Sequence, residues 1–200
     1  MPIAALILYL IFAALGFGWR SWTQYRHTGS TGFRGISGRP GSLEWLAGAG
    51  FIAAILAGLA APLLQLLGIL APVAALNASW IQTSGTVLAV AGIAATLYAQ
   101  RDMGLSWRIG VDPSETTTLV RNGVFGLVRN PIFTAMLVFA AGITLMTPNP
   151  LALAAFLVLL ATIELQVRVV EEPYLNAAHG QAYRDYCEMV GRFVPHIGRA

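Results

Sequence analysis

The pattern of apolar and polar residues predicts a bundle of membrane-spanning helices. A helix that crosses a bilayer needs about 20 mostly apolar residues, because each residue adds about 1.5 Å along the helix axis. Apolar runs that meet or approach this length lie at 3–19, 43–66, 80–99, 132–146 and 151–170. We therefore expect an all-α fold, an integral membrane bundle of about five transmembrane helices that forms a single domain over residues 1–200.

Prolines, glycines and polar clusters set the ends of these runs. The apolar stretch 43–76 is too long for one span, and it contains Pro62, Gly68 and Pro72. These residues disfavour a continuing helix, so the helix is predicted to end near residue 66, followed by an irregular turn to Ser79.

Two further boundaries complete the prediction. The segment 147–150 predicts a tight turn, which makes 132–170 a helical hairpin. The first run, 3–19, could instead be a signal peptide. Because no basic segment precedes it and no A-x-A cleavage site follows it before the polar loop, the sequence favours a retained span.

Arginine positions orient the predicted bundle. All 12 basic residues are arginine. They fall in three polar segments: Arg20, Arg26, Arg34 and Arg39; then Arg101, Arg108, Arg121 and Arg129; then Arg168, Arg184, Arg192 and Arg199. The loops at 67–79 and 147–150 carry no charge. Five spans place the arginine segments on one side of the bilayer, and the positive-inside rule predicts that this side, with the C-terminus, is cytoplasmic.

Composition excludes several other classes of protein. The chain is 56% hydrophobic and 10% charged, whereas a soluble domain carries about 25% charged residues. The sequence pI of about 9.4 comes from arginines that form no dense run, so we expect membrane orientation rather than nucleic-acid binding. The single cysteine, Cys187, permits no intrachain disulfide and no cysteine-based metal cluster, and no metal site is expected.

Polar segments are expected to cap the cytoplasmic mouth of the bundle. The segment 100–130 is too polar for the membrane and forms a connector between the third and fourth spans. The segment 171–190 predicts one amphipathic helix, because tyrosines and alanines recur at helical spacing. On this division, 1–99 holds three N-terminal spans and 100–200 holds the catalytic part.

A first cluster of charged residues ends the fifth span. It consists of Glu164, Arg168, Glu171 and Glu172, whose spacing predicts neighbouring faces of one helix. A carboxylate such as Glu164 inside an apolar run is costly unless it is paired or lines a wet cavity. The cluster fits either a structural ion pair or a site for a zwitterionic or anionic ligand.

Two more clusters flank the helical hairpin. The segment 123–131 places Pro131 in the first turn of a helix and Asn130 at its N-cap, which fits ordinary capping or an anion site. The segment 179–186 combines His179 and Gly180 with two tyrosines at helical spacing, which by itself indicates an amphipathic helix.

Together and in this order, the clusters resemble the isoprenylcysteine carboxyl methyltransferase family, which groups with the phospholipid methyltransferases. Members show Leu-Val-x-x-Gly-x-Tyr-x-x-Val-Arg-His-Pro-x-Tyr, then two helices, an Arg before Glu-Glu, an aromatic-Gly-x-x-Tyr-x-x-Tyr segment and a final Pro. The matching residues, over about 100–197, are Gly104, Trp107, Arg108, Leu119, Val120, Gly123, Phe125, Val128, Arg129, Asn130, Pro131, Phe133, Arg168, Glu171, Glu172, Gly180, Tyr183, Tyr186 and Pro195.

The chain departs from the family pattern at three positions. Asn130 stands where members have His, Phe133 where they have Tyr, and His179 where an aromatic residue precedes the Gly. Asn130 can cap a helix and hydrogen-bond a ligand, but it cannot titrate near neutral pH. Any general-base role of the family His is therefore lost.

The resemblance implies transfer of a methyl group from S-adenosylmethionine to a lipophilic acceptor embedded in the membrane, often a carboxylate. Such a transfer needs in-line placement and exclusion of water rather than a general base. Arg168, held by Glu164, is expected to bind the acceptor carboxylate. The implied cofactor contacts are Trp107, Arg108, Leu119, Val120, Gly123, Phe125, Arg129, Asn130, Pro131, Phe133, Glu171, Glu172 and Tyr183.

Two alternatives stay open at this point. Some membrane sterol reductases share this C-terminal architecture and use NADPH, and a non-catalytic membrane binder of small molecules is the other possibility. No GxGxxG, P-loop, HExxH or GxSxG motif is present. We expect a multi-pass protein of a bacterial or archaeal inner membrane, whose partners are membrane lipids and the acceptor, with no nucleic-acid or protein partner.

Overall fold

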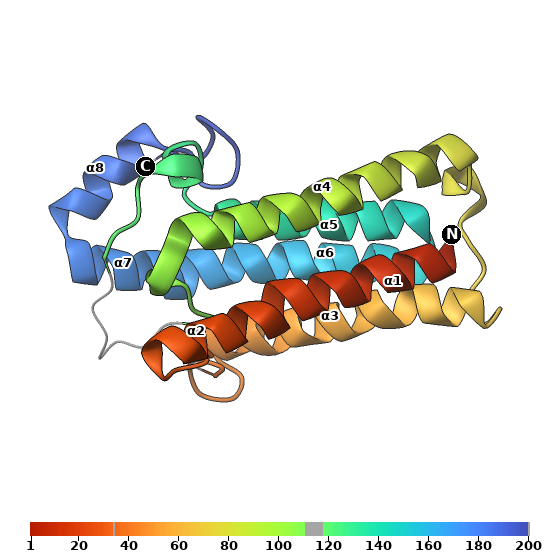
Figure 1. Ribbon diagram of the computed structural model, residues 1–200, viewed down its shortest axis with the longest axis horizontal. Coiled ribbons are helices and arrows are strands. Elements are labelled where there is room, and N and C mark those ends of the chain that lie inside the picture. The colour runs from red at the N-terminus through yellow and green to blue at the C-terminus, as the bar shows by residue number, and fades with distance from the viewer. Residues whose placement is uncertain (34, 111–117, 200) are drawn as a thin grey trace.

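The computed structural model describes residues 1–33, 35–110 and 118–199, and it shows an elongated helical bundle (Figure 1). Arg34, used above to orient the bundle, and residues 111–117 of the connector lie outside the described residues. The elements are α1 (Pro2–Phe12), η1 (Ala13–Trp19), α2 (Arg20–Thr28), α3 (Leu43–Leu66), η2 (Ala74–Leu76), α4 (Ser79–Met103), η3 (Gly104–Ser106), η4 (Gly123–Gly126), α5 (Pro131–Met146), α6 (Pro150–Leu165), η5 (Gln166–Glu171), α7 (Glu172–His179) and α8 (Gln181–Met189).

The fold is the predicted all-α integral membrane bundle. Helices long and apolar enough to cross a bilayer run over Pro2–Thr28, Leu43–Leu66, Ser79–Ser106 and Pro150–His179. The fifth, α5, has 16 residues, or about 24 Å of helix. It is therefore shorter than a hydrocarbon core of about 30 Å.

The short α5 is explained by the turn that joins it to α6. This turn was predicted at 147–150, and it lies inside the bundle rather than at the surface: Asn149 has no exposed surface. The Asn149 amide donates to the carbonyl oxygen of Ala61 (3.0 Å) and to Oε1 of Gln65 (2.9 Å), and its side-chain oxygen accepts from the Ala152 amide (2.9 Å). Buried protein groups thus take the place of water as hydrogen-bond partners at the start of α6.

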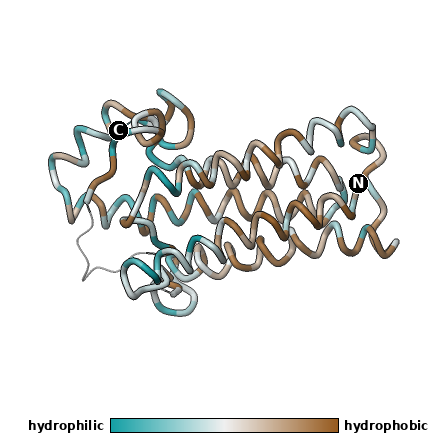
Figure 2. Tube along the Cα trace, in the orientation of Figure 1, coloured by the Kyte–Doolittle hydropathy of each residue, from teal (hydrophilic) through white to brown (hydrophobic). Residues whose placement is uncertain are grey.

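Hydrophilic residues gather at one end of the bundle, where α2, the end of α4, α7 and α8 meet (Figure 2). The N-terminus lies at the other end. The described arginine segments therefore share one end, as predicted. Exposed Trp22 and Tyr25 at the polar end and exposed Trp80 at the other suit the two interfaces of a bilayer, where such rings concentrate.

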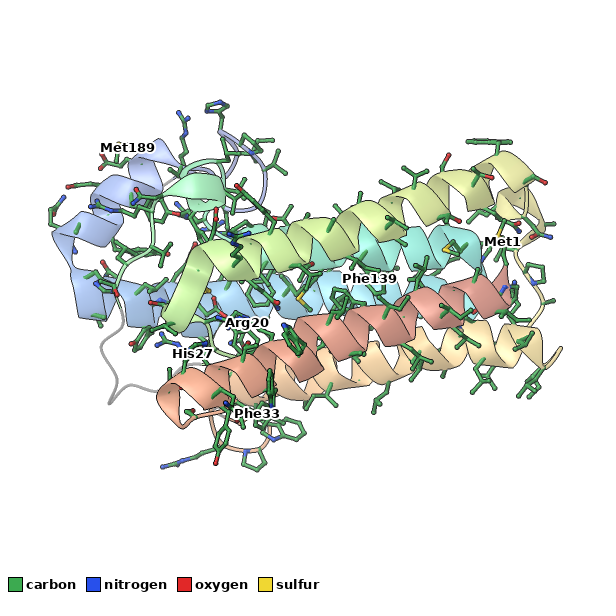
Figure 3. The ribbon with its side chains drawn as sticks, in the orientation of Figure 1. Met1, Arg20, His27, Phe33, Phe139 and Met189 are labelled. Carbon is green, nitrogen blue, oxygen red and sulfur yellow. The ribbon has the colours of Figure 1, made fainter. Side chains whose placement is uncertain are left out.

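Small residues let α4 and α5 pack closely. A Cβ atom at Gly92 would lie 2.5 Å from the backbone nitrogen of Phe139, and one at Gly142 would clash with the backbone of Ala89 and Gly85. Membrane helices gain packing contacts when such residues bring their backbones together. Phe139, labelled midway along the bundle in Figure 3, also stacks on Phe12 of α1 at 4.1 Å between ring centroids.

The prediction of one helix over 171–190 is wrong. Gly180 has φ +53° and separates α7 from α8. Residues with a Cβ rarely adopt this conformation, so a glycine ends the first helix here. As a result, α7 continues the line of α6, and α8 turns away from it across the polar end (Figure 1).

Asn149→Ala should lower the free energy of unfolding by roughly 1–3 kcal/mol, because buried partners lose their hydrogen bonds. Thermal unfolding in detergent measures the change. Asn77→Ala is the matched control, since Asn77 is exposed and its side chain accepts only an exposed hydrogen bond from Gln82 among the described contacts. Equal melting temperatures for the two variants would contradict the structural role of Asn149.

Candidate active site

A cavity of about 440 Å³ opens where the spans meet the connector and the C-terminal segment. Its size suits a small-molecule ligand. The predicted cofactor residues that line it are Trp107, Arg108, Leu119, Val120, Phe125, Arg129, Asn130, Pro131, Phe133, Glu171 and Tyr183. The two other predicted residues, Gly123 and Glu172, are not among its lining residues.

The wall formed by the connector, η5 and α7 is polar and charged. Gln166 donates a hydrogen bond to the Glu171 carboxylate, and Arg108 lies near enough to act on Glu171 by its charge. The Arg108 guanidinium stacks over the Tyr174 ring at 4.7 Å. Nη1 of Arg108 is buried and has no hydrogen-bond partner among the described residues. A buried donor without a partner suits an anionic ligand group.

The opposite wall is apolar and comes from the spans. Phe51, Ile52 and Ile55 of α3 face the cavity together with Phe133 and Met136 of α5. The cavity therefore runs from the polar end of the protein into the hydrophobic interior of the bundle. One chamber can receive both a polar and a lipophilic molecule.

Trp107 joins the connector to the loop that follows α2. Its side chain is buried, and the guanidinium of Arg20 lies 4.9 Å from its ring centroid. Arg20, labelled at the polar end in Figure 3, also donates to the carbonyl oxygen of Gly104. The Ile109 amide donates to the carbonyl oxygen of Gly32 (2.7 Å), which holds the loop against the connector.

Gly123 serves local structure. Its φ is +60°, and a Cβ atom there would collide with the Asp102 carboxylate. Asp102 Oδ2 accepts a hydrogen bond from the Val124 amide (3.0 Å), so this carboxylate satisfies the start of η4. The structure thus gives Gly123 a role in bringing η4 against the end of α4.

Glu172 joins two arginines. Its carboxylate accepts from Nη2 of Arg129 (3.0 Å) and, at both oxygens, from Arg192 (2.7 and 3.0 Å). The hydrogen bond with Glu172 raises the pKa of Arg192 above its usual value. The Arg129 side chain is 2% exposed and also donates to the carbonyl oxygens of Cys187, Val190 and Gly198. Arg129 and Glu172 therefore clamp the C-terminal segment to the bundle.

The C-terminal strap, residues 191–199, runs along the first turn of α5. Backbone amides of Arg129 and Asn130 donate to the carbonyl oxygens of Gly191 and Arg192, and the Thr134 hydroxyl donates to that of Phe193. Asn130 occupies the predicted N-cap position, but its side chain makes no capping bond. Its amide instead donates to the Arg192 carbonyl oxygen (3.1 Å).

Two buried tyrosines of α8 hold the strap side of the cavity. The Tyr186 hydroxyl donates to the carbonyl oxygen of Phe125. Burial raises the pKa of Tyr186 to about 12 and raises that of Tyr183. Both hydroxyls therefore stay protonated at neutral pH and remain able to donate.

Arg168 and Glu164 lie apart from the cavity. Arg168 Nε donates to Glu164 Oε2 (2.6 Å), as the sequence predicted, and both side chains are exposed at 55% and 37%. Neither residue lines the chamber. Their assignment to the acceptor stays an untested prediction, and the ion pair outside the cavity supports the other possibility, a structural role.

The π-helical segment η5 ends at Glu171, and Glu172 begins α7. The hydrogen bonds of η5 run from residue i to i+5, so the side chains after it are displaced from the α-helical spacing assumed for 164–172. Glu171 lines the cavity, and its neighbour Glu172, on the adjacent face of the helix, binds Arg129 and Arg192.

Comparison with known proteins agrees with this architecture. A family model described as phospholipid methyltransferase matches residues 80–182. The chain belongs to the phospholipid methyltransferase family. The predicted resemblance is thus confirmed, and the matched region spans α4, the connector, the helical hairpin and the start of α8.

Relatives of this family member include methyltransferases of plants. It is 29% identical over 120 residues to protein-S-isoprenylcysteine O-methyltransferase A of Arabidopsis thaliana, a match of 59% of this chain and 61% of that protein. It is 32% identical over 79 residues to a probable protein-S-isoprenylcysteine O-methyltransferase of Oryza sativa subsp. indica, covering 40% and 41% of the two chains. The matches thus span less than two thirds of these relatives.

A solved structure shares the fold of this family member. The eukaryotic intramembrane Ras methyltransferase, an isoprenylcysteine carboxyl methyltransferase, aligns with a TM-score of 0.60 and 21% identity. The alignment covers 95% of this chain and 66% of that one. The common fold therefore includes the first two spans, which lie before the region matched by the family model at residues 80–182.

Sequence reasoning missed several residues of the family member's cavity. Gln100 and Gln166 line it; Gln100 directly follows the apolar run 80–99, and Gln166 lies inside the run 151–170. A polar residue inside or directly beside an apolar run is a candidate for function. The sequence therefore contained a signal for these two glutamines. The apolar wall on α3 carries no such signal, because its residues look like any lipid-facing or core positions.

Glu172→Gln should destabilise this family member by about 3 kcal/mol, because it leaves the buried Arg129 without its carboxylate. We expect faster hydrogen exchange in residues 190–199 and a lower melting temperature. Asp185→Asn on α8 removes an exposed carboxylate and should change neither. Unchanged exchange in the strap of the Glu172→Gln protein would show that the clamp does not hold it.

Proposed function

We propose that this chain transfers a methyl group from S-adenosylmethionine to the carboxylate of a lipophilic acceptor in the bilayer. The observation that carries the proposal is a cavity with one charged wall at the polar end and one apolar wall inside the bundle. A polar cofactor from the aqueous side and a lipophilic acceptor from the membrane can meet in such a chamber. The plant relatives are named as O-methyltransferases, which supports the same reaction.

The residues of the charged wall fit the cofactor. Arg108, whose Nη1 lacks a described partner, would hold its carboxylate, and Glu171 would bind its ammonium group or ribose hydroxyls. The segment 119–131 would supply further contacts, with Phe125 or Phe133 beside the adenine. When bound, S-adenosylmethionine supplies an electrophilic methyl group on a sulfonium.

The protein's own residues would place the reactants and exclude water. An ionised carboxylate is already a nucleophile, so no side chain needs to remove a proton. Buried Trp107 and Phe125 in the walls would keep water from the reacting groups. Asn130, which cannot act as a base, is compatible with this reaction.

Membrane orientation is part of the proposal. The positive-inside rule puts the arginine-rich polar end, with the cavity mouth and the C-terminus, in the cytoplasm. We expect S-adenosylmethionine to enter there. Membrane lipids and the acceptor are the expected partners, and location in a bacterial or archaeal inner membrane stays a prediction.

Purified protein should bind S-adenosylhomocysteine and not NADPH, as measured by thermal shift and calorimetry. Glu171→Gln should weaken that binding by about tenfold or more, because a charge-assisted hydrogen bond contributes roughly 1.5–3 kcal/mol. Glu188→Gln, an exposed carboxylate on α8, is the control. If the wild-type protein binds NADPH and not S-adenosylhomocysteine, it is a reductase rather than a methyltransferase. Full affinity of Glu171→Gln for S-adenosylhomocysteine would remove Glu171 from the cofactor site.

Arg168→Lys should keep most methyl transfer, because Arg168 lies outside the cavity and its charge serves Glu164. Arg168→Leu should lower the melting temperature by leaving Glu164 unpaired in the membrane. Initial rates of methyl incorporation and thermal unfolding distinguish the two effects. Loss of most activity in a stable Arg168→Lys protein would show that Arg168 binds the acceptor. The planar guanidinium can bind a carboxylate through two hydrogen bonds, which a lysine cannot reproduce.

A further inference from the structure

Gln100 is a polar side chain in an otherwise apolar part of the cavity wall. Among the lining residues contributed by η1, α3, α4 and α5, all of them described, it is the only one with an amide, hydroxyl or charged side chain. It is 4% exposed. A methionine or leucine could fill this volume without burying an amide, so the glutamine calls for a physical reason.

One end of the Gln100 amide is fixed by the backbone. Nε2 donates to the carbonyl oxygen of Gly16 at 2.8 Å, and Gly16 lies in the π-helical segment η1. Only the nitrogen of an amide can donate to a carbonyl, so the orientation of the amide is determined. Oε1 is therefore turned from Gly16, and it has no hydrogen-bond partner among the described residues.

The depth of Gln100 places it where the two parts of the cavity join. Gly92 of α4 packs against Phe139 of the antiparallel α5. Gln100 lies eight residues after Gly92 on α4, and Pro131 lies eight residues before Phe139 on α5. Gln100 is thus level with the start of α5, between the charged wall of the connector and the apolar wall that ends at Met136.

We propose that Gln100 is a specificity-determining residue, whose Oε1 accepts a hydrogen bond from an N–H or O–H group next to the acceptor's carboxylate. This inference rests on the proposed methyl transfer. An acceptor whose apolar part fills the wall of α3 and α5 must present its carboxylate at the junction. The amides that it can meet from the spans are those of Gln100 and Gln166; Gln166 already binds Glu171, whereas Oε1 of Gln100 has no described partner. A carboxylate offers no donor, so the donor must belong to a neighbouring group of the acceptor.

A pair of acceptor probes tests the hydrogen bond directly. N-palmitoylalanine and O-palmitoyl-lactic acid have the same acyl chain and the same carboxylate. They differ at one group, because the amide N–H of the first is replaced by an ester oxygen in the second. Methyl transfer from S-adenosylmethionine to each probe is measured in detergent micelles. Wild-type protein should prefer the amide by about fivefold to tenfold in kcat/KM, the factor typical of a neutral hydrogen bond.

Gln100→Met should bring the ratio of the two probes close to one. Loss of the bond to Gly16 affects both probes alike and cancels in this ratio, so a merely structural role would not move it. Thr96→Val is the matched control, because Thr96 is buried one turn away on α4, its hydroxyl also lacks a described partner, and it does not line the cavity. It should keep the wild-type ratio.

The outcomes separate this inference from the proposed function. A wild-type ratio near one, or a preference that survives in Gln100→Met, overturns the role of Gln100 and leaves methyl transfer standing. Binding of S-adenosylhomocysteine without methylation of either probe also overturns it, because the acceptor is then of another kind. Absence of S-adenosylhomocysteine binding in the wild-type protein overturns the proposed function itself. Should Gln100→Met not fold, Gln100→Leu and the wild-type ratio still decide.

Discussion

The carboxylate of Glu172, held between Arg129 and Arg192, is the interaction on which the polar end depends. Arg129 lies just before α5 and carries a charge that is almost completely buried, so it needs a carboxylate and several carbonyl oxygens around it. Arg192 begins the strap and binds the same carboxylate at both oxygens. Three segments far apart in the sequence therefore meet at one charge. The cavity wall formed by α8 is positioned by this meeting, because the strap follows α8 directly.

The spans supply a different kind of constraint. Glycines allow α4 and α5 to approach closely, and this pair is the firmest contact of the bundle interior. The cavity opens beside this pair, where α3 and α5 have few contacts with each other. Two π-helical segments, η1 and η5, contribute Phe17, Gln166 and Glu171 to its lining. Such segments turn side chains and carbonyl groups away from α-helical positions, which is how functional residues are often placed.

Much of this architecture could be predicted from the sequence, because its causes are local. The end of α3 near residue 66, the start of α5 at Pro131 and the gathering of arginines at one end follow from length, proline and charge. The separate roles of Glu171 and Glu172 could not be predicted, since they depend on which distant segments pack beside each residue, and the partners of Glu172 are Arg129 and Arg192. The break at Gly180 had a signal in the glycine itself. Arg168 does not line the cavity because of how η5 packs, which spacing alone does not determine.

The departures from the family motif become understandable through these contacts. The side chain of Asn130 donates to the strap, so its amide helps to hold a cavity wall whether or not it touches a ligand. A histidine could fill that position and also titrate, but alkylation of an ionised carboxylate releases no proton that a base must take. The requirement at this position is therefore a hydrogen-bond donor of suitable length rather than a base. By the same reasoning Phe133 keeps the apolar face that the wall needs and loses only a hydroxyl. A chain with these two residues can retain methyl transfer to a carboxylate, whereas an acceptor that must lose a proton would need a base from elsewhere in the cavity, and Glu171 is the described carboxylate that lines it.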